Sequence, residues 1–179
     1  MDVDARDPVF SLCSRFVAAY SKQCPVQASM AGVQGVHRGW DDLSPEGAEA
    51  TRALIARYRR EVLPRPPTSD RWASHARHVA QSFFDEKLSY FESGDCLRDL
   101  NNIESPAQHL RVVFDVMDTA QPGGWEAVAE RLETIDQPIA AYCRALGAGA
   151  ERGQRVVRRQ LEAVIAQAKA HTGEGSSYG

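Results

Sequence analysis

The segment from residue 105 to 118 carries the strongest local signal in the chain, and it is a helix signal. Ser105 is a typical N-cap, whose side-chain oxygen is expected to accept a hydrogen bond from a free backbone N–H of the first turn. Pro106 suits the first helical position, where no N–H donor is needed. One apolar stripe follows at helical spacing: Leu110, Val113, Phe114 and Met117. The segment predicts a buried helix and by itself indicates no reaction.

The same helical periodicity recurs along the chain, and no stretch of useful length alternates as a β-strand would. We therefore predict an all-α fold, with about seven helices in a compact antiparallel array and no β-sheet. The longest pattern spans residues 70–93 and has apolar side chains on more than one face, which predicts a central helix. A helix that begins at Asp136 is expected to end near Leu146, because Gly147 and Gly149 follow.

Length and composition indicate one globular domain. The chain has 179 residues, of which 43% are apolar and 25% charged. We expect a single helical domain over 1–179 with a frayed tail at 172–179. The net charge is −3, so the chain has no excess of positive charge that would indicate binding to nucleic acid. No apolar run approaches the roughly 20 residues of a membrane span, and the first residues lack the pattern of a signal peptide, so we expect no membrane association and a cytoplasmic location.

Two residue classes are candidates for metal or redox chemistry. His75 and His78 lie three residues apart and therefore share a side of the helix predicted over 70–93. They are weak metal candidates, because a zinc site needs three or four converging ligands and no histidine of this chain is followed by glutamate. The cysteines form no CxxC pair, and in a reducing compartment they are predicted to be free thiols.

Carboxylates gather around the first helix described above, at Asp99, Glu104, Asp115 and Asp118. An acid or base role would require burial or close pairing. The favoured interpretation is structural: Asp99 and Asn101 satisfy backbone groups in a turn, and Asp115 pairs with Arg111 four residues earlier.

Four arginines crowd the start of the last predicted helix: Arg152, Arg155, Arg158 and Arg159. Positive charges at the N-terminus of a helix oppose the helix dipole. We therefore expect at least one of these arginines to form a buried ion pair with an acid from 95–118. The pair that we predict is Arg158 with Asp115. A solvated face and an anion site are the alternatives.

A glycine-flanked loop carries Trp40, Asp41 and Asp42. These residues can line the mouth of a site, since loops on a rigid scaffold often carry function. The favoured interpretation is that they cap and dock neighbouring elements.

Three groups of short motifs also carry a family resemblance. They are Pro25-Val26-x-Ala28 with Asp41-Asp42-Leu43-Ser44-Pro45, then Asp99-Leu100-Asn101 with Ser105-Pro106 and Phe114-Asp115-x-Met117, and finally Ala129-x-Arg131-Leu132 with Tyr142 and Arg158-Arg159-Gln160. In this order and spacing they resemble the bacterial domain-of-unknown-function family 885. The resemblance covers nearly the whole chain, from about residue 9 to about residue 173.

The resemblance implies an all-helical protein related to zinc metallopeptidases. Members are usually several times longer, and their zinc signature, His-Glu-x-x-His, lies in a later part of the chain. This sequence is expected to stop before that signature. Zinc is then expected only in a missing C-terminal part, and no catalytic or cofactor-binding residue is assigned to this chain.

Two functional hypotheses follow from different classes. In the first, the chain is the N-terminal helical lobe of a zinc-peptidase-like protein, inactive alone, whose partner is a C-terminal catalytic half. In the second, it is a self-standing helical interaction module that binds a protein partner or itself. An exposed apolar patch near 97–118 or 154–168 would fit either hypothesis.

Overall fold

The computed structural model describes residues 7–63 and 69–172, except for the side chains of residues 171 and 172. Within these ranges the chain forms eight α-helices, one short 3₁₀-helix and no strand, which confirms the predicted all-α class. The elements are α1 (Pro8–Gln23), α2 (Pro25–Met30), α3 (Pro45–Val62), α4 (Arg71–Glu92), η2 (Asp95–Leu97), α5 (Pro106–Val116), α6 (Gly124–Glu133), α7 (Asp136–Glu151) and α8 (Arg158–Thr172).

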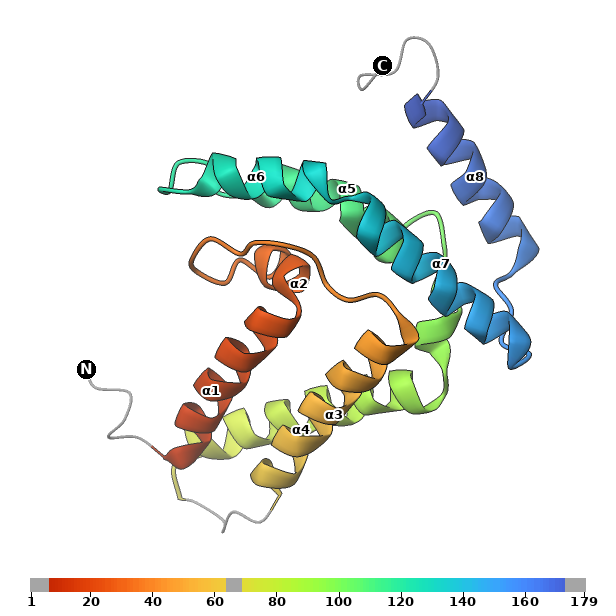
Figure 1. The fold of residues 1–179 in the computed structure, drawn as a ribbon. Coiled ribbons are helices and arrows are strands. Elements are labelled where there is room, and N and C mark those ends of the chain that lie inside the picture. Colours follow the sequence, from red (N-terminus) through yellow and green to blue (C-terminus); the bar gives the residue numbers. More distant parts are fainter. Residues whose placement is uncertain (1–6, 64–68, 173–179) are drawn as a thin grey trace.

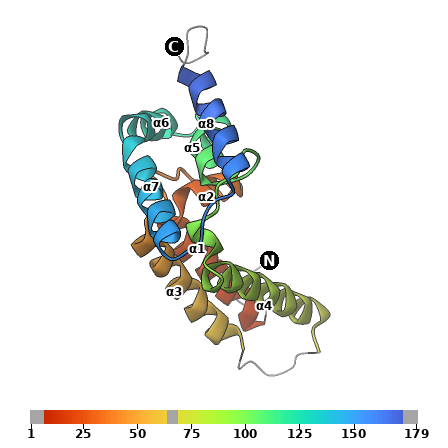
Figure 2. The same cartoon turned by 90° about the vertical axis from the view of Figure 1, so that its right-hand side faces the viewer.

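Two groups of helices stack along the length of the molecule (Figures 1 and 2). Helices α1, α3 and α4 pack on one another at one end, and α2 lies against α5 above them. Helices α6 and α7 follow one another across the top of this arrangement, and α8 projects away from it (Figure 1). The main core lies in the first group, where α1, α3 and α4 bury Val9, Leu12, Phe16, Ile55, Val62 and Phe84.

Local capping chemistry sets the starts of these helices. Asp7 Oδ1 accepts from the backbone N–H of Val9 at 3.0 Å, and Ser44 Oγ accepts from that of Gly47 at 3.1 Å. Each cap satisfies one of the first N–H groups, which have no partner inside the helix. Proline occupies the first position of α1, α2, α3 and α5, which for α5 confirms the prediction made for Pro106.

The helix predicted over 105–118 differs from expectation at both ends. Ser105 is the N-cap, but its hydroxyl makes no capping bond and instead donates to the Gln108 side chain at 2.6 Å. Met117 leaves the helix in an extended conformation (ψ 131°), so α5 ends at Val116 and the predicted stripe loses its last member.

Helix α7 runs five residues past the predicted end at Leu146, so that prediction is wrong. A Cβ at Gly149 would collide with the backbone carbonyl oxygen of Leu97 in η2. Glycine therefore serves close packing at this position instead of ending the helix, and the tertiary contact outweighs its poor helix propensity.

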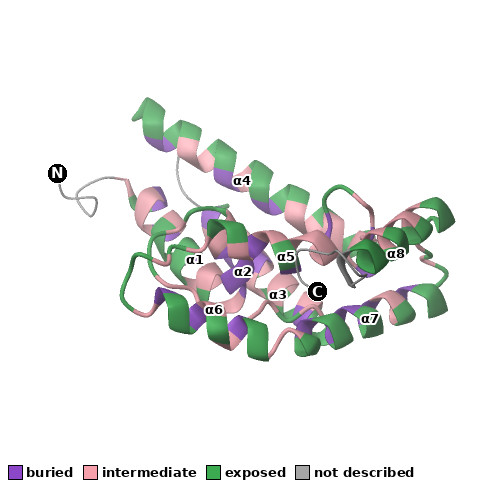
Figure 3. Cartoon of the chain, turned by 90° about the horizontal axis from the view of Figure 1, so that it is seen from above, coloured by how far each residue is buried: buried purple, intermediate pink, exposed green. Residues whose placement is uncertain are grey.

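Helix α4 is not the central helix that its sequence predicts. It buries one face, through Ala73, Ala80 and Phe84, while Trp72 and Val79 are exposed. Figure 3 shows α4 along the edge of the fold. On this second face Trp72 and Val79 face solvent, and Phe83 still contacts Phe16 of α1, with ring centroids 5.8 Å apart.

Helix α8 is attached mainly through amide side chains. Gln160 Oε1 accepts from the backbone N–H of Asn102 at 3.2 Å, and Gln167 Nε2 donates to the Asn102 carbonyl at 2.9 Å. Val157, directly before α8, and Leu161 and Ile165 on it are exposed apolar residues. The predicted tail beyond Thr172 lies outside the described residues.

None of the described helices combines the length and the apolar character that crossing a membrane requires.

Candidate functional site

Many polar and titratable side chains line one cavity of about 590 Å³, here called the polar cleft. It lies where α1, α3 and the second half of α4 meet η2 and the starts of α2 and α5, with one side chain contributed by α7. Its lining includes three tyrosines (Tyr20, Tyr90 and Tyr142), five carboxylates (Asp41, Asp42, Glu86, Asp95 and Asp99), and His109, Cys24 and Thr51.

The loop between α2 and α3 forms one rim of the polar cleft, and the buried Arg131 of α6 holds it. Arg131 is fully shielded from solvent. Its Nε donates to the Gly39 carbonyl at 2.8 Å, and its Nη2 donates to the Pro25 carbonyl at 3.2 Å and to Ser29 Oγ at 3.3 Å. One guanidinium thus ties the loop, both ends of α2 and α6 together.

The same loop docks through Trp40. The indole Nε1–H donates to Thr134 Oγ1 at 3.1 Å, and the ring meets Phe114 edge-on with centroids 5.9 Å apart. The Arg131 guanidinium lies 5.6 Å from the indole centroid, within the range of a cation–π contact. The predicted docking role of Trp40 is therefore confirmed.

Asp41 and Asp42 have both roles that the sequence left open, since they cap neighbouring elements and also line the site. Asp41 Oδ1 accepts from the N–H of Val26 at 2.8 Å, at the start of α2, and Asp42 Oδ1 accepts from that of Ser44 at 3.0 Å, before α3. Both side chains also line the polar cleft. Burial raises the pKa of Asp41 to about 6, although the backbone N–H groups of Val26 and Gln27 and the charge of Arg131 oppose this rise.

The wall of the cleft near α1 and α3 carries neutral hydrogen-bonding groups. Cys24 Sγ lies 3.8 Å from Thr51 Oγ1, which also accepts from Gln23 Nε2 at 3.1 Å. Burial raises the pKa of Cys24 to about 11, and burial together with Cys24 and Asp41 raises the pKa of Tyr20 above its ordinary value. Both groups are therefore protonated at neutral pH, and Cys24 is not an activated nucleophile. All four cysteines are free thiols, as predicted.

Another part of the lining is organised around Asp99. Tyr90 donates its hydroxyl to Asp99 Oδ2 at 2.7 Å, and Tyr142 donates to the Asp99 backbone carbonyl. Burial, followed by the charge of Asp99, raises the pKa of Tyr90, and burial also raises that of Tyr142. Asp99 thus accepts from hydroxyl donors, whereas the turn role predicted for Asp99 and Asn101 is seen at Asn101, whose Oδ1 accepts from the N–H groups of Ile103 at 2.9 Å and Glu104 at 2.7 Å.

His109 lies in the first turn of α5 and is one of several cleft residues that sequence reasoning missed. Its Nε2 is 2.8 Å from Glu104 Oε1, and its Nδ1 is 3.2 Å from Gln27 Nε2. The carboxylate can only accept and the amide nitrogen can only donate, so the arrangement assigns the proton to Nε2. Gln27 and His109 are 82 residues apart in sequence, and no local pattern signals such a pair.

The metal candidates lie outside the cleft. His75 and His78 are both exposed on α4. Within residues 7–63 and 69–172, no three His, Cys, Asp or Glu side chains gather as a metal ion requires. The described residues therefore do not fit the zinc that the family resemblance implies.

The predicted buried ion pair between Arg158 and Asp115 is wrong. Arg158 is 90% exposed in its side chain and pairs with Glu162 one turn along α8, with Nε and Oε1 2.7 Å apart. Asp115 pairs with Arg111 at 3.5 Å, which confirms the structural alternative. Arg152, Arg155 and Arg159 are exposed as well, so the arginines form a solvated face.

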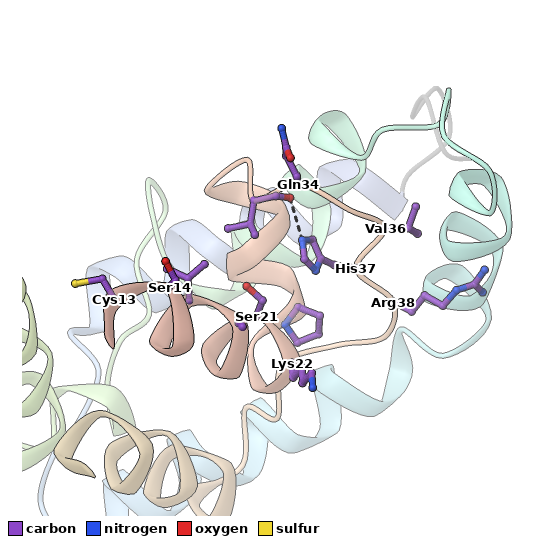
Figure 4. Close-up of a pocket in the computed structure, with 12 residues that line it drawn as sticks. Cys13, Ser14, Ser21, Lys22, Gln34, Val36, His37 and Arg38 are labelled. Atoms are coloured by element: carbon purple, nitrogen blue, oxygen red, sulfur yellow. Dashed lines mark hydrogen bonds between the residues drawn. The ribbon is translucent and has the colours of Figure 1, made fainter. Parts of the chain in front are cut away.

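A second, more open groove runs along α1 beside the loop after α2, with a volume of about 750 Å³ (Figure 4). Apolar residues such as Val17 and Val36 line it, together with Lys22 and Arg38. His37 is turned toward the backbone, where its Nε2 lies 3.0 Å from the Val33 carbonyl oxygen. This groove contains no carboxylate and fewer polar groups than the polar cleft.

The sequence of the chain matches the model of a known protein family. A family model described as "Bacterial protein of unknown function (DUF885)" matches residues 25–177. The chain belongs to this family. The part matched to DUF885 includes every residue that lines the polar cleft except Tyr20 and Cys24. No curated protein matches the chain.

Proposed function

We propose that this DUF885 chain is the helical lobe of a zinc-peptidase-like protein and that its polar cleft binds a peptide, forming one wall of a substrate channel. The zinc and the general base would come from another part of the protein. The observation that carries this proposal is the polar cleft itself, a cavity of about 590 Å³ rich in hydroxyl and carboxylate groups. Its size lies within the range of small-ligand pockets.

The lining of the cleft suits an extended backbone better than it suits chemistry on its own. A peptide presents N–H donors and C=O acceptors, and the cleft offers carboxylate oxygens at Asp41 and Asp42 and the hydroxyl of Thr51. The thiol and the phenols are held protonated, and the imidazole of His109 uses both nitrogens within the protein. These groups bind and orient more readily than they transfer protons.

Peptide binding, zinc content and hydrolysis together test this proposal. We expect the purified chain to bind short peptides, to hydrolyse none of them, and to contain no stoichiometric zinc when prepared without chelator. Ala48→Phe fills the cleft from α3 and is expected to weaken peptide binding at least tenfold. Ala53→Phe places the same ring on the exposed side of that helix and should leave binding unchanged. Hydrolysis supported by zinc bound to this chain, or no peptide binding at all, would contradict the proposal.

A second function, an interaction module, is favoured by a specific observation on α8. Val157, Leu161 and Ile165 repeat every four residues and are 43–65% exposed, so they form one apolar stripe toward solvent. Such a stripe suits self-association or a protein partner. If peptides do not bind in the cleft and sedimentation velocity shows dimers that Leu161→Ser abolishes, this second function is favoured over the first.

A further inference from the structure

The polar cleft has an excess of negative charge that its own residues do not balance. Five carboxylates line it, against one lysine. Asp95 is balanced by Arg98, which lies outside the cleft, with Nη2 and Oδ1 2.6 Å apart. The remaining four are Asp41, Asp42, Glu86 and Asp99. Asp42 and Glu86 are exposed, whereas Asp41 and Asp99 are half-buried, where electrostatic interactions are stronger. Together they favour a positively charged ligand.

The cations near the cleft are engaged elsewhere. Lys87 Nζ lies 5.9 Å from the ring centroid of Phe83, which is not part of the lining. Arg131 directs Nε and Nη2 to two backbone carbonyls and a serine hydroxyl on the rim. The nitrogens of His109 face Glu104 and Gln27. Among the described residues, Asp42, Glu86 and Asp99 form no ion pair, and Lys87 is the one lysine or arginine of the lining, so the negative charge remains in excess.

Aromatic side chains provide the rest of the recognition surface. Tyr20 comes from α1, Tyr90 and Phe91 from α4, and Tyr142 from α7, so rings line the cleft from several directions. Aromatic faces attract ammonium and guanidinium groups through their quadrupole, and more strongly when water is excluded. The hydroxyls of Tyr90 and Tyr142 are fixed by Asp99, which restricts how these two rings can turn.

We propose that the polar cleft selects peptides that carry a cationic group, an ammonium or a guanidinium, held between the tyrosine rings and the unbalanced carboxylates. This inference rests on the proposed peptide-binding function and names its substrate class. An anionic group would add to the existing repulsion, and a purely apolar side chain would desolvate the half-buried Asp41 and Asp99 further without giving them a charged partner. A cationic group satisfies both the carboxylates and the rings.

Matched peptides test the choice of charge. The full chain is titrated by calorimetry with Ac-Ala-Ala-Lys-Ala-Ala-NH₂ and with the same peptide carrying norleucine in place of lysine. Two further peptides, one with arginine and one with a free amino terminus, distinguish the sources of the cation. We expect the lysine peptide to bind at least tenfold tighter than the norleucine peptide. We also expect this advantage to shrink as salt is raised from 20 to 500 mM, because screening weakens it.

A variant in which three cleft carboxylates are replaced by neutral amides tests whether the cleft causes the preference for lysine. The substitutions Asp42→Asn, Glu86→Gln and Asp99→Asn keep the acceptor oxygens that bind Ser44 N–H and Tyr90 O–H, so the fold is expected to survive. Their control carries Glu126→Gln, Glu133→Gln and Glu151→Gln, three exposed acids outside the cleft with the same change in net charge.

The outcomes separate the two proposals. Loss of the lysine advantage in the cleft variant and its retention in the control support cation selection. Equal binding of the lysine and norleucine peptides by the unmodified chain, or an advantage insensitive to salt, overturns cation selection while leaving peptide binding intact. If neither peptide binds, the proposed function itself fails.

Discussion

Replacing Arg131 with methionine is the sharpest test of how the rim of the polar cleft is held. Methionine retains much of the length and volume of the arginine stem but has no donor. The substitution removes the bonds to the Gly39 and Pro25 carbonyls and to Ser29 Oγ. It also removes the cation that faces the carboxylate of Asp41.

The size of the effect follows from complete burial. Removing one partner of a buried charged network strands the others, which typically costs about 3–5 kcal/mol. Arg131 Nη1 has no hydrogen-bond partner among the described residues, so relief of that buried donor returns part of the loss. We therefore expect Arg131→Met to lower the free energy of unfolding by about 3 kcal/mol.

Urea unfolding followed by far-UV circular dichroism measures this loss, with Arg38→Met as the control. Arg38 lies in the same loop but is half-exposed, with Glu130 as its partner at 3.2 Å, so its removal should cost less than about 1 kcal/mol. The combination of Arg131→Met with Asp41→Asn should be less destabilised than the sum of the single changes, because the two groups interact. If Arg131→Met costs no more than Arg38→Met, the loop is not held as described.

Three further predictions concern other parts of the molecule. Because the folded-state pKa of Asp41 is about 6 against an ordinary value of 3.8, its contribution to stability is fully present below pH 3.8 and is lost as the pH rises through 6. The stability of the unmodified chain relative to Asp41→Asn should accordingly fall by about 3 kcal/mol between pH 3.5 and 7 in urea titrations, and a constant difference would refute the burial argument. Gly149→Ala should cost about 1–3 kcal/mol, whereas Gly147→Ala, whose added methyl meets open space in the same helix, should add up to about 1 kcal/mol; equal thermal midpoints would contradict the packing argument. Leu161→Ser with Ile165→Ser should change the unfolding free energy by less than about 1 kcal/mol, since both side chains are exposed on α8, and a larger loss would place them in a packed interface.

Much of the fold can be predicted from the sequence because local chemistry determines it. Asp7, Ser44 and Asp70 combine a cap with the apolar periodicity that follows, and the helices begin where these residues indicate. The end of α7 could not be predicted in this way. Gly149 looks like a helix breaker until the carbonyl of Leu97 is found against it, and that contact joins residues about fifty positions apart.

The residues of the candidate site likewise divide into those with a local sequence signal and those that only the tertiary packing brings together. Asp41 and Asp42 could be identified, because a glycine-flanked loop with two acids before a Ser-Pro helix start is a local pattern. His109 could not be identified, since its partners come from α2 and from the loop before α5, and only the packing of these elements brings them together. The arginines before α8 misled the prediction: their abundance suggested a buried pair, but Arg158 is satisfied within its own helix.

The most direct test of the account maps peptide binding on the ¹H–¹⁵N spectrum of the isotopically labelled chain. A peptide in the polar cleft should shift the amides of Thr51, Tyr90, Asp99 and Tyr142, which come from separate segments but line one cavity. Shifts confined to α8, or an unchanged spectrum at saturating peptide, would contradict the claim that this cleft is the functional site.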